Sequence, residues 1–321
     1  MHFTKPPYHI TSEILNLLTQ ISEKIGAVNA IQLNRPPAEL RKSHRIKTIH
    51  STLSIEGNVL TEEQITALLD NKRVLAPEKD IIEVKNAIEV YNMLNKFNPL
   101  KLKSLLKAHN VLMKGLITNA GKFRTGNVGI VKGSKITHVA PQGNMVTGLL
   151  NNLLDYAKQD NDPILIKSCV FHYEFEFIHP FNDGNGRMGR LWQTLLLMNE
   201  SLVFEYLPVE SMIKAEQNRY YEALNKSDSL GHCTPFIAFM LDCILKSLNA
   251  LHHLPNVALK EEDRISVFKE IIGKKSFTRK DYLQHFKSIS SATASRDLKF
   301  ATEREILHRT GTQRLSSYIY K

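Results

Sequence analysis

The stretch between residues 163 and 200 constrains the fold more than any other part of the chain. Two helical patterns there are separated by a short loop that contains proline and glycine. The first pattern runs over 163–178, and Pro180 ends it just after His179 because proline disfavours a helical conformation at the preceding residue. The second runs over 187–200, so we expect two packed helices with the loop at the N-terminus of the second. Their inward-facing residues are predicted to be Ile166, Val170, Tyr173 and Phe177, and Met188, Leu191, Trp192, Leu195 and Leu196.

Helical spacing of apolar residues continues over most of the remaining chain. It predicts helices over 11–29, 39–55, 61–70, 80–96, 100–112, 146–158, 213–227 and 235–252. Thr61 and Gln64 form a predicted capping pair for the third of these helices. Between Gly126 and Val139 the sequence turns β-branched and contains glycine, which predicts one short hairpin. The fold class is therefore mainly α, a helical bundle with one β-hairpin.

The composition is typical of a folded protein in a reducing compartment. Hydrophobic residues make up 42% and charged residues 23% of the 321 positions, which is enough for a core. The three cysteines, Cys169, Cys233 and Cys243, form no Cys-x-x-Cys pair and are expected to be small buried residues. No apolar leader is apparent, and no stretch reaches about 18 uninterrupted apolar residues. We expect a cytoplasmic protein without membrane contact, and the net charge of +10 favours an anionic partner.

The loop between the two central helices contains residues suited to binding phosphate. It opens a helix, where free backbone N–H groups and the helix dipole favour an anion. Gly184 and Gly186 let the backbone approach a phosphate closely, and Asn185 adds a side-chain donor. Arg187 and Arg190 lie three residues apart on the new helix, so both are expected to clamp further phosphates.

Two more residues of this loop supply reactive groups. Asp183 offers a hard oxygen ligand, suited to a Mg²⁺ ion that also binds phosphate oxygens. An ordinary imidazole has a pKa of about 6.5, so a neutral His179 can accept a proton from an attacking hydroxyl. A Gly-Asn-Gly turn or a single histidine alone would be weak evidence of function, but the ordered combination is much more specific.

The order His179-Pro-Phe-x-Asp183-Gly-Asn-Gly-Arg187-x-x-Arg190 resembles the signature of Fic-domain proteins, with no departure at a motif position. The resemblance implies a helical Fic fold in which His179 deprotonates a target hydroxyl and Asp183 holds Mg²⁺. The implied enzyme is a nucleotidyltransferase, a protein adenylyltransferase that moves AMP from ATP to a Ser, Thr or Tyr hydroxyl of a protein.

The same resemblance assigns the phosphate contacts. It implies that Gly184, Asn185 and Gly186 form the anion hole for the α-phosphate of ATP. Arg187 and Arg190 would hold the outer phosphates, and pyrophosphate would leave. No sequence signature identifies the base pocket, although Tyr220 and Tyr221 are candidates to line it, so the choice of ATP among nucleotides stays open.

A second segment resembles the flap of the family. It runs from Gly121-Lys-Phe-Arg124 through Val128-Gly-Ile130 to His138-Val-Ala-Pro141. The resemblance implies that the target protein docks on the hairpin over 126–139 by adding a strand to it, which fixes register without demanding much sequence.

A third segment, Thr52-Leu-Ser-Ile-Glu56-Gly57-Asn58, resembles an inhibitory motif that precedes the Fic core. It implies that Glu56 pairs with Arg190 in place of the γ-phosphate contact. Nucleotide would bind with its α-phosphate misaligned, and the chain would inhibit itself. The alternative is an ordinary glutamate before a glycine-terminated helix.

Other chemistries stay open on the same residues. Some family members use the inhibitory glutamate to orient a water for the reverse reaction, removal of AMP. A Doc-like kinase shares the fold and transfers a phosphoryl group, although the intact Gly184-Asn185-Gly186 loop favours AMP transfer. Glu176-x-x-His179 with His172 could also belong to a di-iron site, but such a site needs a second pair of this kind and two further glutamates on other helices, and the sequence offers no matching set.

The segment after residue 253 reads as a separate basic domain. Lys260 to Lys321 contains 14 Lys/Arg against 8 Asp/Glu, and Leu254-Pro-Asn256 resembles a linker. Three predicted helices and a hairpin around Gly311 resemble a winged helix-turn-helix, with Thr293, Ser295 and Arg296 beginning the recognition helix. DNA binding through 260–321 is therefore an alternative function, and protein contact is another.

These predictions divide the chain into three domains. They are an N-terminal helical region with the inhibitory helix (1–95), a Fic catalytic core (96–253) and a winged-helix-like domain (254–321). The target protein, self-modification and homodimerisation stay open at this stage.

Overall fold

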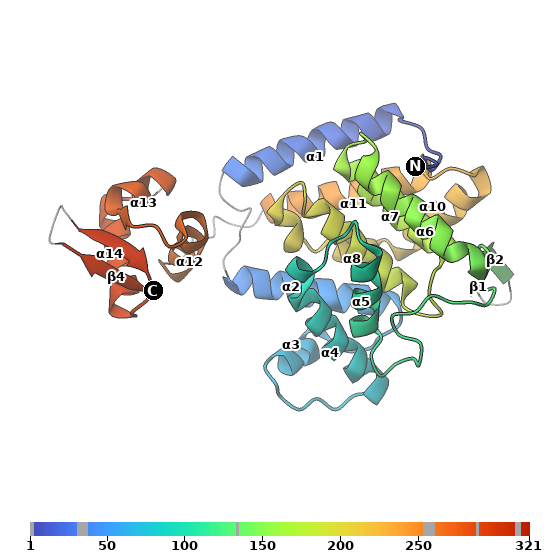
Figure 1. Cartoon of the computed structure of the whole chain (residues 1–321), viewed down its shortest axis with the longest axis horizontal. Coiled ribbons are helices and arrows are strands. Elements are labelled where there is room, and N and C mark those ends of the chain that lie inside the picture. The colour runs from blue at the N-terminus through green and yellow to red at the C-terminus, as the bar shows by residue number, and fades with distance from the viewer. Residues whose placement is uncertain (1–2, 31–37, 133–134, 253–260, 287–288, 312–315) are drawn as a thin grey trace. The chain divides into compact units, whose positions relative to one another are not determined.

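The computed structural model describes residues 3–30, 38–132, 135–252, 261–286, 289–311 and 316–321 (Figure 1). The chain groups into two compact units, the first of 1–34 with 42–253 and the second of 35–41 with 254–321. The finer division of the first unit at residue 95 stays a prediction, as does the linker at 254–256, which lies outside the described residues.

The first unit consists of helices and one β-hairpin. Its helices are α1 (Ser12–Ala30), α2 (Ala38–Ile55), α3 (Glu62–Leu69), α4 (Glu78–Asn92), α5 (Leu102–Leu112), α6 (Val146–Gln159), α7 (Ile164–Ile178), α8 (Asn185–Leu197), α9 (Val209–Ala215), α10 (Gln217–Leu230) and α11 (Thr234–His252). Single 3₁₀ turns occupy Leu94–Lys96, Gly143–Met145 and Leu202–Glu205. Strands β1 (Gly129–Lys132) and β2 (Lys135–Val139) pair antiparallel. The predicted mainly α fold with one hairpin is confirmed for this unit.

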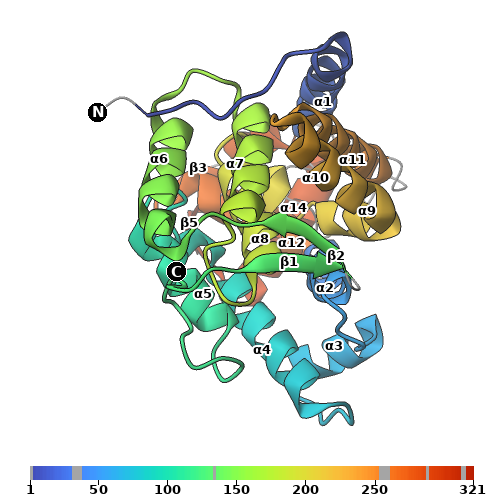
Figure 2. The ribbon, with the colours of Figure 1, turned by 90° about the vertical axis from the view of Figure 1, so that its right-hand side faces the viewer.

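Helices α7 and α8 pack against each other at the centre of the first unit. Figure 2 shows α6 on one side of α7, with α10 and α11 on the other. Because α7 has neighbours on several sides, nearly all of its apolar residues are buried, on every side of the helix. Phe177 was wrongly predicted to face inward, since it is 36% exposed in the last turn of α7, where the helix reaches a pocket. The other eight predicted residues are buried: Ile166, Val170, Tyr173, Met188, Leu191, Trp192, Leu195 and Leu196.

Two helix ends follow the predicted capping signals. Thr61 and Gln64 form a reciprocal capping box at the start of α3, as predicted. The end of α2 is a tight turn in which Gly57 has a φ of 93°, a conformation that favours glycine. The N–H groups of Gly57 and Asn58 donate back to Ser54 and Leu53. Glu56 is thereby fixed in the turn that directly follows α2.

The prediction of a single helix over 213–227 is wrong, because the two helices α9 and α10 occupy this region. The backbone leaves the helical conformation at Glu216, where φ is −115° and ψ is 34°. The Glu216 carboxylate is bound by Lys246 of α11. The ion pair with Lys246 lies at the position where α9 ends and α10 begins. The spacing of apolar residues does not reveal this interruption of the helix.

Helix α11 is apolar because it is a core element. Its window Thr234–Leu251 has a mean hydropathy of 1.3 and is long enough to cross a membrane, but 61% of the window is buried within the chain. Cys233 and Cys243, and Cys169 on α7, are free and buried as predicted.

Within its described residues after position 260, the second unit contains three helices and a three-stranded sheet. In chain order its elements are α12 (Glu261–Ile272), β3 (Phe277–Thr278), α13 (Arg279–His285), α14 (Ser291–Glu303), β4 (Leu307–Thr310) and β5 (Ser317–Tyr320). The antiparallel sheet has the order β3-β5-β4. Arg264 of α12 binds both carboxylate oxygens of Asp297 on α14, at 2.6 and 2.8 Å, and the Tyr282 hydroxyl donates to the same carboxylate. The surrounding core includes Phe268, Phe277, Leu298, Leu307 and Tyr320.

Candidate active site

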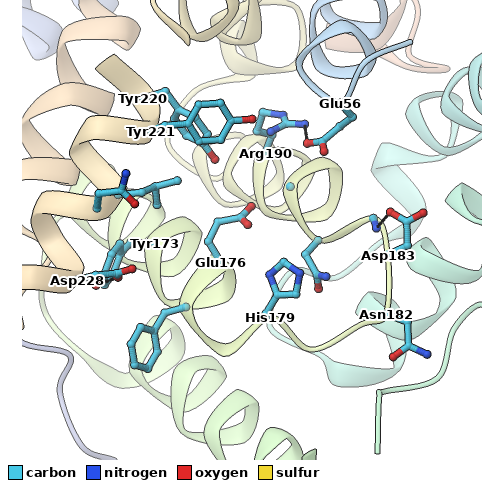
Figure 3. Close-up of a pocket in the computed structure, with 16 residues that line it drawn as sticks. Glu56, Tyr173, Glu176, His179, Asn182, Asp183, Arg190, Tyr220, Tyr221 and Asp228 are labelled. Carbon is cyan, nitrogen blue, oxygen red and sulfur yellow. Dashed lines mark hydrogen bonds and ion pairs between the residues drawn. The ribbon is translucent and has the colours of Figure 1, made fainter. Parts of the chain in front are cut away.

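A pocket of about 410 Å³ lies between the α7–α8 loop, the end of α2 and one side of α10 (Figure 3). Seven of the eight predicted site residues line this pocket, and the eighth, Arg187, does not. The seven are Glu56, His179, Asp183, Gly184, Asn185, Gly186 and Arg190. The far end is lined by Tyr173, Tyr220, Tyr221, Leu224, Asn225 and Asp228, which include the two tyrosines considered for a base pocket.

His179 ends α7 in a left-handed turn. Its N–H still donates to the carbonyl of Phe175 at 3.0 Å, but its φ of 48° and ψ of 61° take the chain out of the helix. Such a conformation costs roughly 1–3 kcal/mol in a residue other than glycine, so the surroundings must hold it. The turn places the imidazole on the pocket wall rather than along the helix (Figure 3).

Arg124 supplies part of that restraint. Its guanidinium donates to the carbonyls of Ile178 at 3.1 Å and His179 at 2.7 Å, and to those of Gly126 and Pro141 at 2.7 and 2.6 Å. The side chain is 1% exposed, and burial lowers the pKa of Arg124 while leaving the guanidinium charged. The carbonyl end of α7 carries partial negative charge that balances this cation. One side chain therefore joins the end of α7 to both ends of the flap segment.

The N-terminus of α8 forms an open anion site. Gly184 precedes it with a φ of 83°, and no side chain caps the helix, which leaves N–H groups for a ligand. This φ favours glycine, and a Cβ at Gly184 would also meet the sulfur of Met113 at 2.7 Å. The Asn185 amide exchanges hydrogen bonds of 2.9 and 2.8 Å with the backbone of Phe181. Its side chain thus shapes the loop.

His109 of α5 holds the same loop through the carbonyl of Asp183. Its Nδ1 accepts from the N–H of Gly121 at 2.8 Å, so Nε2 carries the proton and donates to the carbonyl of Asp183 at 3.0 Å. The ring stacks on Phe181 with centroids 3.5 Å apart. Burial lowers the pKa of His109 to about 4, which keeps the ring neutral. The sequence offered no signal for this residue.

Asp183 presents a carboxylate to the pocket that fits a magnesium ion. The side chain is 48% exposed, and Oδ1 receives the N–H of Gly184 at 2.6 Å and Nη2 of Arg187 at 3.2 Å. Both contacts fall on one oxygen of a carboxylate that lines the pocket and is about half exposed. Among the described residues no three His, Cys, Asp or Glu side chains cluster as a metal cage. Mg²⁺ suits such a site because it binds through one or two carboxylates together with phosphates and waters.

Arg190 is held by the end of α2. Its Nη2 lies 2.7 Å from Oε1 of Glu56, and Nε and Nη2 donate to the hydroxyl and carbonyl of Thr52 at 2.9 and 3.1 Å. The Arg190 side chain is 1% exposed. Burial acts to lower the pKa of Arg190, but the Glu56 carboxylate together with Tyr220 and Glu176 outweighs burial, so the pKa is raised. The predicted pair between Glu56 and Arg190 is therefore present.

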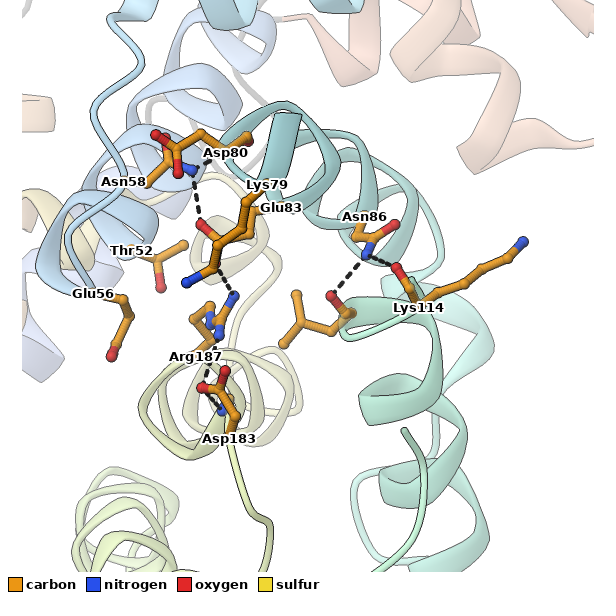
Figure 4. A network of polar contacts seen from close by, with 12 residues as sticks. Thr52, Glu56, Asn58, Lys79, Asp80, Glu83, Asn86, Lys114, Asp183 and Arg187 are labelled. Atoms are coloured by element: carbon orange, nitrogen blue, oxygen red, sulfur yellow. Dashed lines mark hydrogen bonds and ion pairs between the residues drawn. The ribbon is translucent and has the colours of Figure 1, made fainter. Parts of the chain in front are cut away.

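Arg187 points to a different neighbour than predicted. It is 4% exposed and lies between the carboxylates of Asp183 and Glu83, the latter on α4 (Figure 4). The prediction of a shared clamp relied on the spacing between Arg187 and Arg190. On α8 the two side chains extend to different partners, α4 and α2.

The histidine considered for a di-iron site is a structural residue. His172 is fully buried, its Nδ1 donates to Gln193 at 2.8 Å, and its Nε2 accepts from Tyr220 at 3.2 Å. Burial, followed by the charge of Arg190, lowers the pKa of His172 to about 3. Neither nitrogen is directed to a metal cluster of described residues.

Comparisons with known proteins identify the family of this chain. Residues 99–197 match the model of the Fic/DOC family. A solved Fic family protein from Desulfovibrio desulfuricans G20 is 38% identical and superposes with a TM-score of 0.75, over 99% of this chain and 98% of that one. The protein adenylyltransferase fic-1 of Caenorhabditis briggsae is 32% identical over 206 residues, which are 60% of this chain and 38% of the relative. The chain thus spans about two fifths of that relative. The likeness over its full length to the D. desulfuricans protein, together with the family match at the loop, shows that the chain belongs to the Fic/DOC family.

Proposed function

We propose that this chain transfers AMP from ATP to a hydroxyl of a target protein, with His179 as the general base. One observation carries the proposal: a single pocket contains His179, the uncapped N-terminus of α8 and Asp183, and Glu56 holds Arg190 at its edge. The relative from Caenorhabditis briggsae is named a protein adenylyltransferase, which supports the same reaction class.

The residues have separate roles in this proposal. Backbone N–H groups at the start of α8 bind the α-phosphate and stabilise the charge that develops there. The target oxygen forms a bond to the α-phosphorus, the bond to the bridging oxygen of the β-phosphate breaks, and pyrophosphate leaves. His179 accepts the proton of the hydroxyl, a role that contributes a rate factor of about 10²–10⁴. A Mg²⁺ ion held by Asp183 would offset negative charge on the phosphates.

Glu56 acts as a brake in the same proposal. Its carboxylate lies against the loop as well as on Arg190, since a Cβ added at Gly186 would meet Oε1 at 2.3 Å. An outer phosphate that needs Arg190 must compete with this carboxylate. The triphosphate would then bind displaced, and a shift of ~1 Å can cost about a hundredfold in rate.

The experiment is AMP transfer by the full chain, with ATP labelled on the α-phosphate and a cell lysate as the source of targets. Glu56→Gly is expected to raise labelling and His179→Ala to abolish it. Asn71→Gly is the matched control, because this exposed residue already has a φ of 56° that glycine tolerates. If Glu56→Gly labels no more protein than the wild type, Glu56 is not a brake. Self-modification would appear in the same gel.

Mass spectrometry of the modified protein separates the remaining chemistries. An added adenylyl group supports the proposal, and an added phosphate alone would indicate a Doc-like kinase. Release of AMP from a modified substrate by the wild type would indicate that the reverse reaction dominates, with Glu56 orienting water.

We also propose that the target docks on the flap over 126–139. Strands β1 and β2 form a two-stranded sheet, so each has an outer edge to which an extended segment can add. Arg124 donates to the carbonyls of Gly126 and Pro141 at the ends of the flap and to the carbonyl of His179, and this link between the flap and the residue of the base supports the proposal. Proline substitution at Ile130 is expected to lower transfer to proteins while leaving ATP binding unchanged.

A second function is proposed for the basic second unit, namely duplex DNA binding by a winged helix. Its element order and β3-β5-β4 sheet are those expected for such a domain, and Arg296 and Lys299 are exposed on α14. Affinity for a labelled duplex should fall steeply with added salt and after Arg296→Ala with Lys299→Ala. Lys103→Ala, an exposed change in the first unit, is the control. Equal binding by both variants would contradict the proposal.

A further inference from the structure

Glu83 of α4 reaches the active site through a chain of polar contacts (Figure 4). It is 6% exposed, and its Oε1 lies 3.3 Å from Nη1 of Arg187. Arg187 donates from Nη2 to Oδ1 of Asp183 at 3.2 Å. One buried guanidinium therefore lies between two carboxylates, of which only Asp183 lines the pocket.

The second oxygen of Glu83 is also occupied. It accepts from Nδ2 of Asn58 at 2.8 Å, and Asn58 directly follows the turn that contains Glu56. Asn58 is buried and also donates to the carbonyl of Asp80 at 3.2 Å. These contacts fix the Glu83 side chain in one orientation toward Arg187.

The charges explain what Glu83 can do. Without it, Arg187 and Asp183 would form a neutral pair, and a divalent cation would have to compete with the guanidinium for that carboxylate. With Glu83 ionised, Arg187 is neutralised from the other side and the three groups together carry a net negative charge. Lys79 lies 3.9 Å from Glu83, but its side chain is 71% exposed, so water screens its effect.

We propose that Glu83 is a positioning residue whose charge neutralises Arg187 and thereby keeps the Asp183 carboxylate available to a divalent cation. The inference rests on the proposed function and deepens it. Arg187 is then mainly a holder of Asp183 rather than a clamp on the outer phosphates. Its burial and its position outside the pocket lining support this assignment.

The experiment measures binding of α,β-methylene ATP, which cannot transfer AMP, to the full chain over a range of Mg²⁺ concentrations. Glu83→Gln keeps the shape of the side chain and removes its charge. It is expected to raise the Mg²⁺ concentration for half-maximal binding by about tenfold, which corresponds to the loss of one charge near the site. Glu89→Gln, an exposed change on the same helix, is the control and should leave this midpoint unchanged.

A double variant tests whether Glu83 acts through Arg187. Once Arg187→Gln removes the cation, the counter-charge is no longer needed, so Glu83→Gln combined with Arg187→Gln should return the Mg²⁺ midpoint toward the wild-type value. A merely structural role of Glu83 would lower stability in both variants without this reversal. Arg187→Gln alone should leave the midpoint unchanged or lower it, and this variant can be measured even if Glu83→Gln does not fold.

The outcomes separate the inference from the proposed function. An unchanged midpoint in Glu83→Gln, an equal shift in Glu89→Gln, a raised midpoint in Arg187→Gln or no reversal in the double variant would each overturn the inference alone. If the wild type fails to bind the ATP analogue over the whole range of Mg²⁺ concentrations, the proposed function itself is contradicted.

Discussion

The guanidinium of Arg190 lies 2.7 Å from the carboxylate of Glu56, and this ion pair joins the signature helix α8 to the turn after α2. It is one of three contacts, because Thr52 binds the same guanidinium through its hydroxyl and its carbonyl. Release of Arg190 to a phosphate must therefore break contacts with Thr52 as well as with Glu56.

The Thr52 hydroxyl should contribute a smaller share of the proposed inhibition than the Glu56 carboxylate. Thr52→Val keeps the shape of the side chain and removes the acceptor for Nε of Arg190. A hydrogen bond to a charged group contributes roughly 1.5–3 kcal/mol, so AMP transfer is expected to rise by at least about tenfold, but by less than in Glu56→Gly. Thr48→Val, one turn earlier on α2 and also buried, is the control. Transfer below the wild-type level would show that Thr52 supports catalysis instead.

Loss of the Arg124 side chain should destabilise the first unit strongly. Arg124→Met leaves four backbone carbonyls without their donor, and we expect a loss of roughly 3–5 kcal/mol in the free energy of unfolding. Trp192 is the only tryptophan and is buried on α8, so its fluorescence in urea reports on this unit. Lys122→Met, an exposed neighbour, should change little. A loss below about 1 kcal/mol would mean that water or other groups replace the guanidinium.

Most of the pocket could be predicted because its residues are consecutive in the sequence. His179, Asp183 and Gly184 through Gly186 occupy one loop, and helical periodicity on both sides places that loop at a helix start. Glu56 was found through a second motif far from this loop. A motif of residues that are close in the sequence therefore predicts well that their side chains lie close together in the fold.

The supporting residues could not be predicted, because their roles depend on contacts between distant segments. Glu83 is one carboxylate among several on α4, and only the fold brings it to Arg187. His109 has no neighbouring motif, yet its ring is held by Gly121 and by the carbonyl of Asp183. Helical spacing suggests that Arg187 and Arg190 reach the same ligand, but it does not show which partners the two side chains meet in the fold.

His109 should make the first unit sensitive to acid. Its pKa is lowered to about 4 by burial, against 6.5 in the unfolded chain, so the unfolded chain binds its proton first as the pH falls. The contribution of neutral His109 is fully present above pH 6.5 and is lost toward pH 4, by up to roughly 3 kcal/mol. In His109→Gln the stability measured by Trp192 fluorescence should therefore depend less on pH between 6.5 and 4. His9→Gln, at an exposed position, is the control, and an unchanged acid slope in His109→Gln would contradict the assignment.

Glu210 should produce the opposite dependence on pH. It is 2% exposed on α9, and burial raises its pKa to about 7 from 4.5 although its own backbone, Arg190, Tyr91 and Arg45 act to lower it. The folded protein therefore holds this proton more tightly than the unfolded chain, so stability falls as the pH rises from 4.5 through 7, by up to roughly 3 kcal/mol.

Glu210→Gln removes this ionisation and should stabilise the chain at pH 8 while changing little at pH 5. The measurement is the difference between the variant and the wild type in urea unfolding at the two pH values, followed by Trp192 fluorescence. Glu200→Gln, at an exposed position, should show no such difference. If Glu210→Gln destabilises the protein more at pH 8 than at pH 5, the ionised carboxylate is a favourable partner of Arg190 and Arg45. Burial would then not be the dominant influence on this side chain.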